Sequence, residues 1–283
     1  MAAPKARRNT TIFAGLLYLV SLPFLLLVLL GNTHNTAVLR DLYFFRLNVA
    51  QIIPIAVSNA NLLNSVARSL GLHDFYQFGL WNFCEGYLDT GITYCSPPHT
   101  FYWFNPVEIL VSELLAGAKI ALPAQVLTVL KLLEIGSKVM YAFFMAGTVL
   151  GFVALLATPL VLRARWFSLL VSLLGGLCGL LLTVAAIIAT LISVAAKVAL
   201  TAQDQLNIGA SIGVKMFAFM WIGALATDSA FLLHAAMGCC CKPDRAAVTA
   251  STSGTSPKKT NSELPSFLRR RKPSPPEQSS NNT

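Results

Sequence analysis

The sequence predicts a membrane protein of all-α class, a four-helix bundle that carries a small extracellular α+β domain. Composition is the first reason: 55% of the 283 residues are hydrophobic and 12% are charged, whereas a soluble domain has about 25% charged residues. The second reason is that four stretches contain the roughly 20 apolar residues that a membrane-spanning helix needs. The third is a long segment between the first two stretches that contains two cysteines. This composition excludes an ordinary soluble enzyme.

The four spans follow from the uninterrupted apolar runs. We place them at residues 12–31, 139–162, 166–196 and 214–237. The basic residues before the first run resemble the start of a cleaved signal peptide, but the run exceeds the apolar region of about 7–15 residues that such peptides have, so we interpret it as a retained anchor. The third span is longer than a hydrocarbon core of about 30 Å requires. It must tilt or project beyond the outer leaflet, where it can support the external domain.

The distribution of basic residues predicts the orientation. Most of the 21 Lys and Arg residues lie in residues 1–11, 163–165 and 238–283, which share one side of the membrane if the spans alternate. Cytoplasmic segments carry an excess of Lys and Arg. We therefore predict a multi-pass plasma-membrane protein with both termini in the cytoplasm. Residues 32–138 then form the extracellular domain and residues 197–213 a short extracellular turn. The charge of +9 is explained in this way, and no nucleic-acid partner is expected.

The extracellular segment contains patterns of both strands and helices. Aromatic and β-branched residues broken by Gly, Asn and Asp predict strands at residues 42–49, 74–83 and 91–94. Asn105, Pro106 and Glu108 have the spacing of an N-cap, a first-turn proline and a capping-box glutamate, which predicts a helix to about residue 115. A second helix is expected from about Pro123 and leads into the second span.

Two of the six cysteines, Cys84 and Cys95, lie in the extracellular segment. Gly86 and Gly91 between them permit a hairpin. Because the outside of a cell is oxidising, a disulfide is the expected state of such a pair. A metal site is the alternative, but neighbouring histidines do not have ligand spacing to these cysteines.

The residues around the first cysteine resemble a known family. The run Gly79-Leu80-Trp81-Asn82-Phe83-Cys84, followed by Cys95, resembles the motif of claudin-like four-span proteins. The run at 42–47 and the stretch containing Leu122-Pro123 resemble the fungal branch, the eisosome (cortical patch) Sur-seven-type proteins and the pH-response regulator PalI. The resemblance covers residues 12 to about 240. It implies that the disulfide joins neighbouring strands and that Trp81 anchors the sheet near the outer membrane face.

Some residues within the spans are candidates for packing or function. Gly147 with Gly151 and Gly175 with Gly179 form small-xxx-small pairs, which let helices approach closely, within one chain or between copies. Asp228 is an acidic residue inside a span and therefore a functional candidate. The alternative is a structural hydrogen bond near Thr227, Ser229 or the 163–165 loop. His234 is expected at the inner head groups.

Aromatic residues also cluster around the second cysteine. They are Tyr94, Phe101, Tyr102 and Trp103. Such amphipathic rings favour the membrane–water interface, and the alternative is that they fill the small core of the external domain.

The C-terminal segment has the composition of a disordered cytoplasmic tail from about residue 249 onward. Three juxtamembrane cysteines, Cys239, Cys240 and Cys241, are candidates for palmitoylation or remain free thiols. A basic run attracts anionic lipids, and it consists of Arg269, Arg270, Arg271 and Lys272.

These features predict a non-enzymatic protein without a cofactor or metal, since the sequence contains no P-loop, HExxH, GxSxG or paired-carboxylate pattern. The resemblance implies an organiser of plasma-membrane microdomains (eisosomes or cortical patches) that affects endocytosis and cell-wall organisation. Its expected partners are membrane lipids, other membrane or cell-wall components and, as a homo-oligomer, further copies. A PalI-like accessory role in ambient-pH signalling is the alternative. A channel or transporter is disfavoured, because a single intramembrane carboxylate forms a poor polar pathway.

Overall fold

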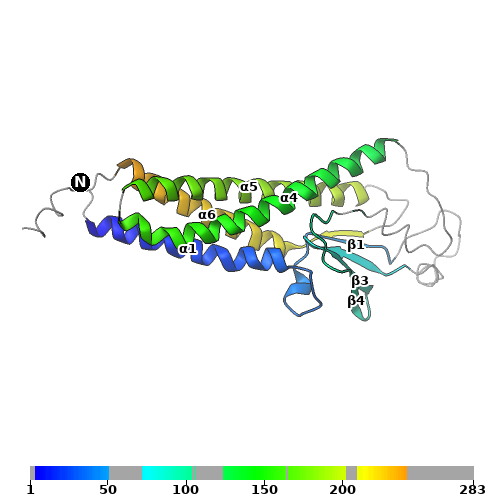
Figure 1. Cartoon of the computed structure of the whole chain (residues 1–283). Helices are drawn as coiled ribbons and strands as arrows, with labels where there is room; N and C mark the ends of the chain where they lie inside the picture. The colour runs from blue at the N-terminus through cyan, green and yellow to red at the C-terminus, as the bar shows by residue number, and fades with distance from the viewer. Residues whose placement is uncertain are drawn as a thin grey trace, which may run out of the picture. The chain divides into compact units, whose positions relative to one another are not determined.

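The structure, a computed structural model, describes residues 4–50, 72–103, 105, 124–163, 165–201 and 209–240. Within these residues, four long helices pack side by side and a five-stranded antiparallel sheet lies at one end of them (Figure 1). The predicted fold class, a claudin-like four-helix membrane protein with a small sheet-containing domain, is confirmed in these two parts. The helix expected over residues 105–115 lies outside the described residues, apart from Asn105.

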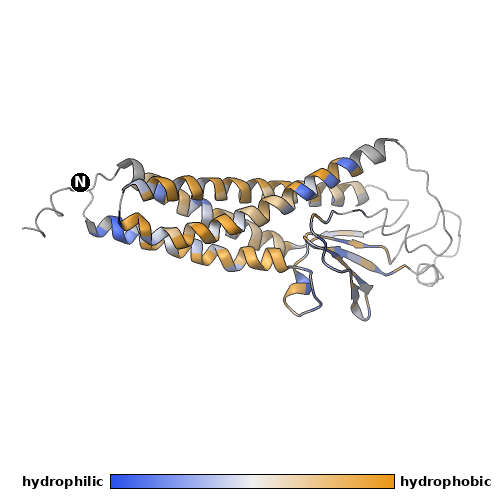
Figure 2. Cartoon of the chain, viewed as in Figure 1, coloured by the Kyte–Doolittle hydropathy of each residue, from blue (hydrophilic) through white to orange (hydrophobic). Residues whose placement is uncertain are grey.

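The helices are longer than the predicted spans. They are α1 (Pro4–Leu30), α4 (Ala124–Ala157, continued by the 3-10 turn η3, Thr158–Leu162), α5 (Arg165–Thr201) and α6 (Val214–Cys240). Each is long and apolar enough to cross a membrane, and its residues are largely hydrophobic along its length (Figure 2). Trp166 is 83% exposed and Leu173 is 74% exposed. In water such exposure is unfavourable, whereas lipid accommodates it, as in a multi-pass membrane protein.

Two helices extend past the other two. At 1.5 Å per residue, the 34 residues of α4 and the 37 of α5 span about 50–55 Å, against about 40 Å for the 27 residues each of α1 and α6. The extra turns of α4 and α5 lie alongside the sheet (Figure 1). Leu133 of α4 and Ala196 of α5 pack against the sheet's apolar residues. The third span thus supports the sheet, as its length predicted.

The sheet has one apolar and one polar face. Its strands are β1 (Phe45–Asn48), β2 (Phe75–Phe78), β3 (Phe83–Tyr87), β4 (Gly91–Cys95) and β5 (Gly209–Ile212), in the spatial order β4-β3-β2-β1-β5. Directly paired residues share a face. The apolar face contains the cross-strand pairs Phe45–Phe78 and Leu47–Tyr76, while the polar face contains Arg46 opposite Gln77.

Two sequence predictions about this region are wrong. Residues 74–83 do not form one strand, because the chain turns between β2 and β3, where the Gly79 amide donates to the Asn82 carbonyl over 2.9 Å. Residues 197–213 are not a simple turn either. Helix α5 continues to Thr201, and Gly209–Ile212 pairs antiparallel with β1. Pairing satisfies the backbone groups on the second edge of β1, which would otherwise be left open.

The end of the bundle opposite the sheet brings together three separate parts of the chain. The Arg7 guanidinium donates to the Val161 carbonyl over 2.8 Å, and the Thr11 hydroxyl contacts the Met237 sulfur at 3.6 Å. The start of α1, the turn after α4 and the end of α6 are therefore neighbours. This is the grouping on which the predicted orientation depends.

Both predicted small-xxx-small pairs lie against neighbouring helices of the same chain. A Cβ added at Gly147 would lie 2.7 Å from the Leu182 side chain, and one at Gly151 would lie 3.4 Å from the Cys178 sulfur. On α5, a Cβ at Gly175 would approach the Tyr18 hydroxyl to 2.3 Å. The pairs thus pack helices within one chain, one of the two interpretations open from the sequence.

Gly147 and Gly151 provide a matched test of this packing. We expect Gly147→Ala to destabilise the protein by about 1–3 kcal/mol through overpacking against Leu182. Gly151→Ala should leave stability unchanged or slightly raised, since its Cβ makes an ordinary contact and alanine favours helix. Thermal unfolding in detergent measures both effects. Equal melting temperatures for the two variants would contradict the assigned packing.

Candidate functional site at the junction of the sheet and the helices

The Gly-Leu-Trp-x-x-Cys motif joins the sheet to the helix bundle. Leu80 is 1% exposed and belongs to the core formed by the helices. The Trp81 indole donates to the Leu29 carbonyl over 2.7 Å, and its ring packs edge-on against Tyr141 of α4 at 4.9 Å. Leu29 is in the last turn of α1, where carbonyls lack helical partners. The indole therefore caps α1 while it fixes the β2–β3 connection.

Gly79 of the motif lets the β2–β3 connection approach the end of α1 closely enough for the Trp81–Leu29 hydrogen bond. A Cβ at position 79 would lie 2.7 Å from the Cβ of Asn32 and 3.0 Å from the Gly31 carbonyl. Asn32, two residues after the end of α1, has a φ of 62°, in the left-handed region that asparagine tolerates better than most residues. A larger residue at position 79 would push the sheet away from the helix.

The predicted disulfide is present between Cys84 and Cys95. The two residues are directly opposite each other in β3 and β4, with their Cα atoms 4.0 Å apart. The disulfide therefore joins neighbouring strands of the hairpin, as the resemblance implied. Because Cys84 is only three residues after Trp81, the disulfide restrains β3, the strand that leads directly out of the junction.

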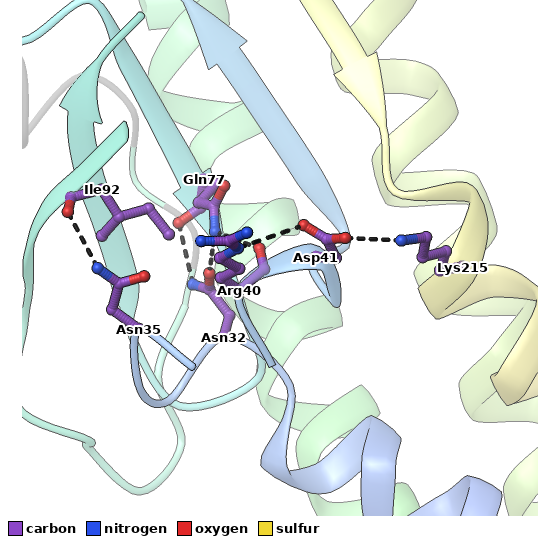
Figure 3. Close-up of polar contacts among 7 residues, drawn as sticks. All are labelled: Asn32, Asn35, Arg40, Asp41, Gln77, Ile92 and Lys215. Atoms are coloured by element: carbon purple, nitrogen blue, oxygen red, sulfur yellow. Dashed lines mark hydrogen bonds and ion pairs between the residues drawn. The ribbon is translucent and has the colours of Figure 1, made fainter. Parts of the chain in front are cut away.

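A buried amide pair extends the junction into the sheet (Figure 3). The Gln77 side-chain amide donates to Asn32 Oδ1 over 2.6 Å and to the Arg40 carbonyl over 2.8 Å, and Asn32 Nδ2 donates to the Gln77 carbonyl over 3.1 Å. Asn32 and Gln77 are both buried. Buried amides are stabilising when their donors and acceptors are paired, so this network fixes β2 to the end of α1.

An ion pair connects the same region to α6. Lys215 Nζ lies 2.6 Å from Asp41 Oδ2, and Arg40 Nε lies 4.0 Å from the other carboxylate oxygen (Figure 3). Asp41 ends the 3-10 turn η1 (Leu39–Asp41). All three side chains are about half exposed or more, and exposed pairs contribute at most about 1 kcal/mol. The pair orients these side chains more than it stabilises the fold.

Asp228 takes part in a hydrogen bond between helices. Its Oδ2 accepts from the Thr183 hydroxyl of α5 over 2.8 Å, and Gly179 leaves room for its other oxygen, which a Cβ there would approach to 2.1 Å. The partners suggested by the sequence are engaged elsewhere: Thr227 donates to Gly223 and Ser229 to Leu225. Asp228 therefore makes a structural hydrogen bond, which was the alternative to a functional role, but its partner is Thr183 and not one of the residues expected from the sequence.

His234 is buried between helices near the end of α6, and its level relative to the head groups stays a prediction. Its side chain is 0% exposed and its ring stacks on Tyr18 of α1 with ring centroids 6.0 Å apart. The reason is that α6 packs against α1 along this stretch and turns the imidazole inward.

The aromatic cluster divides between the two interpretations. Tyr102 packs against the apolar face of the sheet, and the Phe101 ring lies 4.9 Å from that of Tyr141. Tyr94 and Phe101 are each about half exposed. Tyr102 therefore fills the core between sheet and helices, whereas Tyr94 and Phe101 remain partly at the surface.

Several candidate residues have no described side chain. Cys239 and Cys240 lie in the last turn of α6 with side chains that are not described, and Cys241 and the basic run at 269–272 lie outside the described residues. Among the described residues, no group of three His, Cys, Asp or Glu side chains is arranged to hold a metal ion.

Comparison with known proteins identifies the family. The model of the SUR7/PalI family matches residues 10–233, which include most of the four helices and the whole sheet. The chain belongs to the SUR7/PalI family. It is 27% identical to the SUR7 family protein pun1 of Schizosaccharomyces pombe over 253 residues, covering 74% of this chain and 86% of that protein. It is 25% identical to Protein PUN1 of Saccharomyces cerevisiae over 166 residues, covering 56% of this chain and 61% of that protein.

The indole contact of this SUR7/PalI member can be tested by conservative substitution. We expect Trp81→Phe to destabilise the protein by about 1–3 kcal/mol, because the Leu29 carbonyl loses its donor. Trp166→Phe is the matched control, since Trp166 is 83% exposed, and it should not change the melting temperature. Unfolding in detergent measures both variants. If Trp81→Phe has the same melting temperature as the wild type, the indole does not fix the junction.

Proposed function

We propose that this protein is a non-enzymatic organiser of microdomains, of the eisosome or cortical-patch kind, in a fungal plasma membrane. The observation that carries the proposal is the match of the SUR7/PalI family model to residues 10–233. That range contains most of each helix, the sheet and the junction between them, so the similarity is not confined to the apolar spans. Both relatives with named organisms are fungal proteins.

The geometry supports a scaffold that acts by lateral assembly. Its helices present apolar side chains outward along their length, such as Leu173 and Leu180 on α5. Its sheet is fixed to them by the Trp81–Leu29 and Asn32–Gln77 hydrogen bonds. A sheet attached in this way adopts a defined orientation to the bilayer, which a protein that organises neighbours requires. Lipids and other membrane or wall components are the proposed partners, with further copies of the chain among them.

The proposed orientation has both termini in the cytoplasm and the sheet outside. The bias of Lys and Arg toward residues 1–11, 163–165 and 238–283 supports it, as does the disulfide, which oxidising surroundings favour. In this orientation Cys239–Cys241 and the basic run at 269–272 face the inner leaflet. Acylation of the three cysteines and electrostatic attraction of the basic run to anionic lipids would attach the tail to the membrane.

Imaging of the tagged full-length chain in its fungal host tests the function. We expect stable patches at the plasma membrane with little fluorescence recovery after bleaching, and altered endocytosis and cell-wall organisation after deletion. A Cys84→Ser, Cys95→Ser double variant should lose the patches, because a closed loop of this length contributes about 2–3 kcal/mol to stability. Tyr94→Phe is the matched control on the same strand and should keep them.

Membrane fractionation must first show equal amounts of the variants at the plasma membrane. Evenly spread, rapidly recovering wild-type protein would contradict the scaffold. If deletion in addition abolished growth at alkaline pH, the PalI-like signalling role that the family name includes would replace it.

A further inference from the structure

A cavity of about 590 Å³ opens on the polar face of the sheet, where α6 begins. It lies between β1, β2, the η1 turn, the β3–β4 hairpin and the first residues of α6. The residues that carry the argument are Arg40, Asp41, Arg46, Phe75, Val214 and Lys215. The cavity is open to the surroundings, and several of these residues appear in Figure 3.

The charged groups of this cavity favour an anion. Arg40, Arg46 and Lys215 contribute three positive charges against the single carboxylate of Asp41. Asp41 is shared between Arg40 and Lys215. Within the described part of the chain, Arg46 has no carboxylate at ion-pair distance, so its charge is not neutralised by a neighbour.

Arg46 is also positioned for recognition. Its guanidinium carbon lies 3.7 Å from the centroid of the Phe75 ring. Stacking on an aromatic ring holds the planar guanidinium while its N–H groups remain able to bind. A planar fork of donors suits two oxygens of one phosphate. Arg46 is therefore oriented by its own neighbour rather than by a ligand.

The start of α6 adds a second, independent feature that favours anions. This 27-residue helix begins at Val214, in the wall of the cavity, and has no acidic residue in its first turn. The first turn of a helix leaves backbone N–H groups without helical acceptors and carries a partial positive charge. Phosphate groups bind at such termini.

The level of the cavity indicates which anion it meets. Its wall includes the first residue of the candidate span Val214–Met237, and the span Arg7–Leu30 ends next to the same junction. Val214 is 78% exposed. A membrane-spanning helix begins where the hydrocarbon region meets the head groups, so the cationic groups are at the level of lipid phosphates and Val214 is placed against the adjoining acyl chains.

We propose that this cavity binds the phosphate of an anionic lipid head group from the leaflet at the sheet end of the bundle. Arg46 and the first turn of α6 hold the phosphate oxygens, and Lys215 and Arg40 supply the surrounding positive charge. The site requires only that the helices cross a membrane, and it goes beyond the scaffold role, so either can fail without the other.

Binding of phosphatidylinositol to the full-length chain in neutral detergent tests the site, with native mass spectrometry or titration as the readout. We expect Arg46→Gln to weaken binding about ten-fold, the effect of losing a charge-assisted contact. The double variant with Lys215→Gln should bind still more weakly. Lys131→Gln is the matched control, an exposed charge at the sheet end outside the cavity. The basic run at 269–272 is neutralised in all samples, and melting temperatures confirm folding.

Three results would overturn the proposal. The first is equal loss of binding in Lys131→Gln and Arg46→Gln, which would indicate attraction by net charge alone. The second is equal binding of diacylglycerol, which lacks the phosphate. The third is inorganic phosphate competing as strongly as the lipid itself, which would make the site one for free phosphate.

Discussion

The pairing of β1 with β5 is the constraint on which the rest of the structure depends. β1 follows α1 and β5 leads directly into α6, so this pairing joins segments more than 150 residues apart and sets where both helices meet the sheet. Gly213, between β5 and α6, passes so close to Tyr43 that a Cβ would lie 1.8 Å from its carbonyl oxygen. A side chain there would separate the strands, so a glycine is needed where the chain turns from sheet to helix.

The same junction explains why the motif residues occur together. Gly79 lets the β2–β3 connection approach α1, Leu80 enters the helical core, and Trp81 caps the Leu29 carbonyl. Each contact requires the others, because a displaced connection would remove both the apolar burial and the hydrogen bond. Cys84 then ties the next strand to β4. The short motif at residues 79–84 thus specifies the connection between the sheet and the membrane-spanning helices.

The features that could be predicted from the sequence are those that depend on residues close together in the chain. The spans, the disulfide and the hairpin depend on apolar runs, cysteine spacing and glycines that are neighbours in the chain. β5 was missed because Gly-Ala-Ser-Ile has little strand propensity, and it forms a strand only through β1. The partner of Asp228 was missed for the same reason, since Thr183 lies 45 residues away on another helix. The cavity is lined by residues from separate segments between Arg40 and Lys215, so no short stretch of sequence predicts it.

The unequal lengths of the helices determine how the sheet can face a membrane. A sheet with an apolar face would ordinarily sink toward lipid, but here the extensions of α4 and α5 cover that face with Leu133 and Ala196. The shorter helices α1 and α6 end at the other side, beside Arg46 and Lys215. The apolar face of the sheet is therefore covered within the protein, and the opposite face carries the cationic groups. The position of the sheet follows from where each helix ends, and its polar face opens on the side where the lipid phosphate site is proposed.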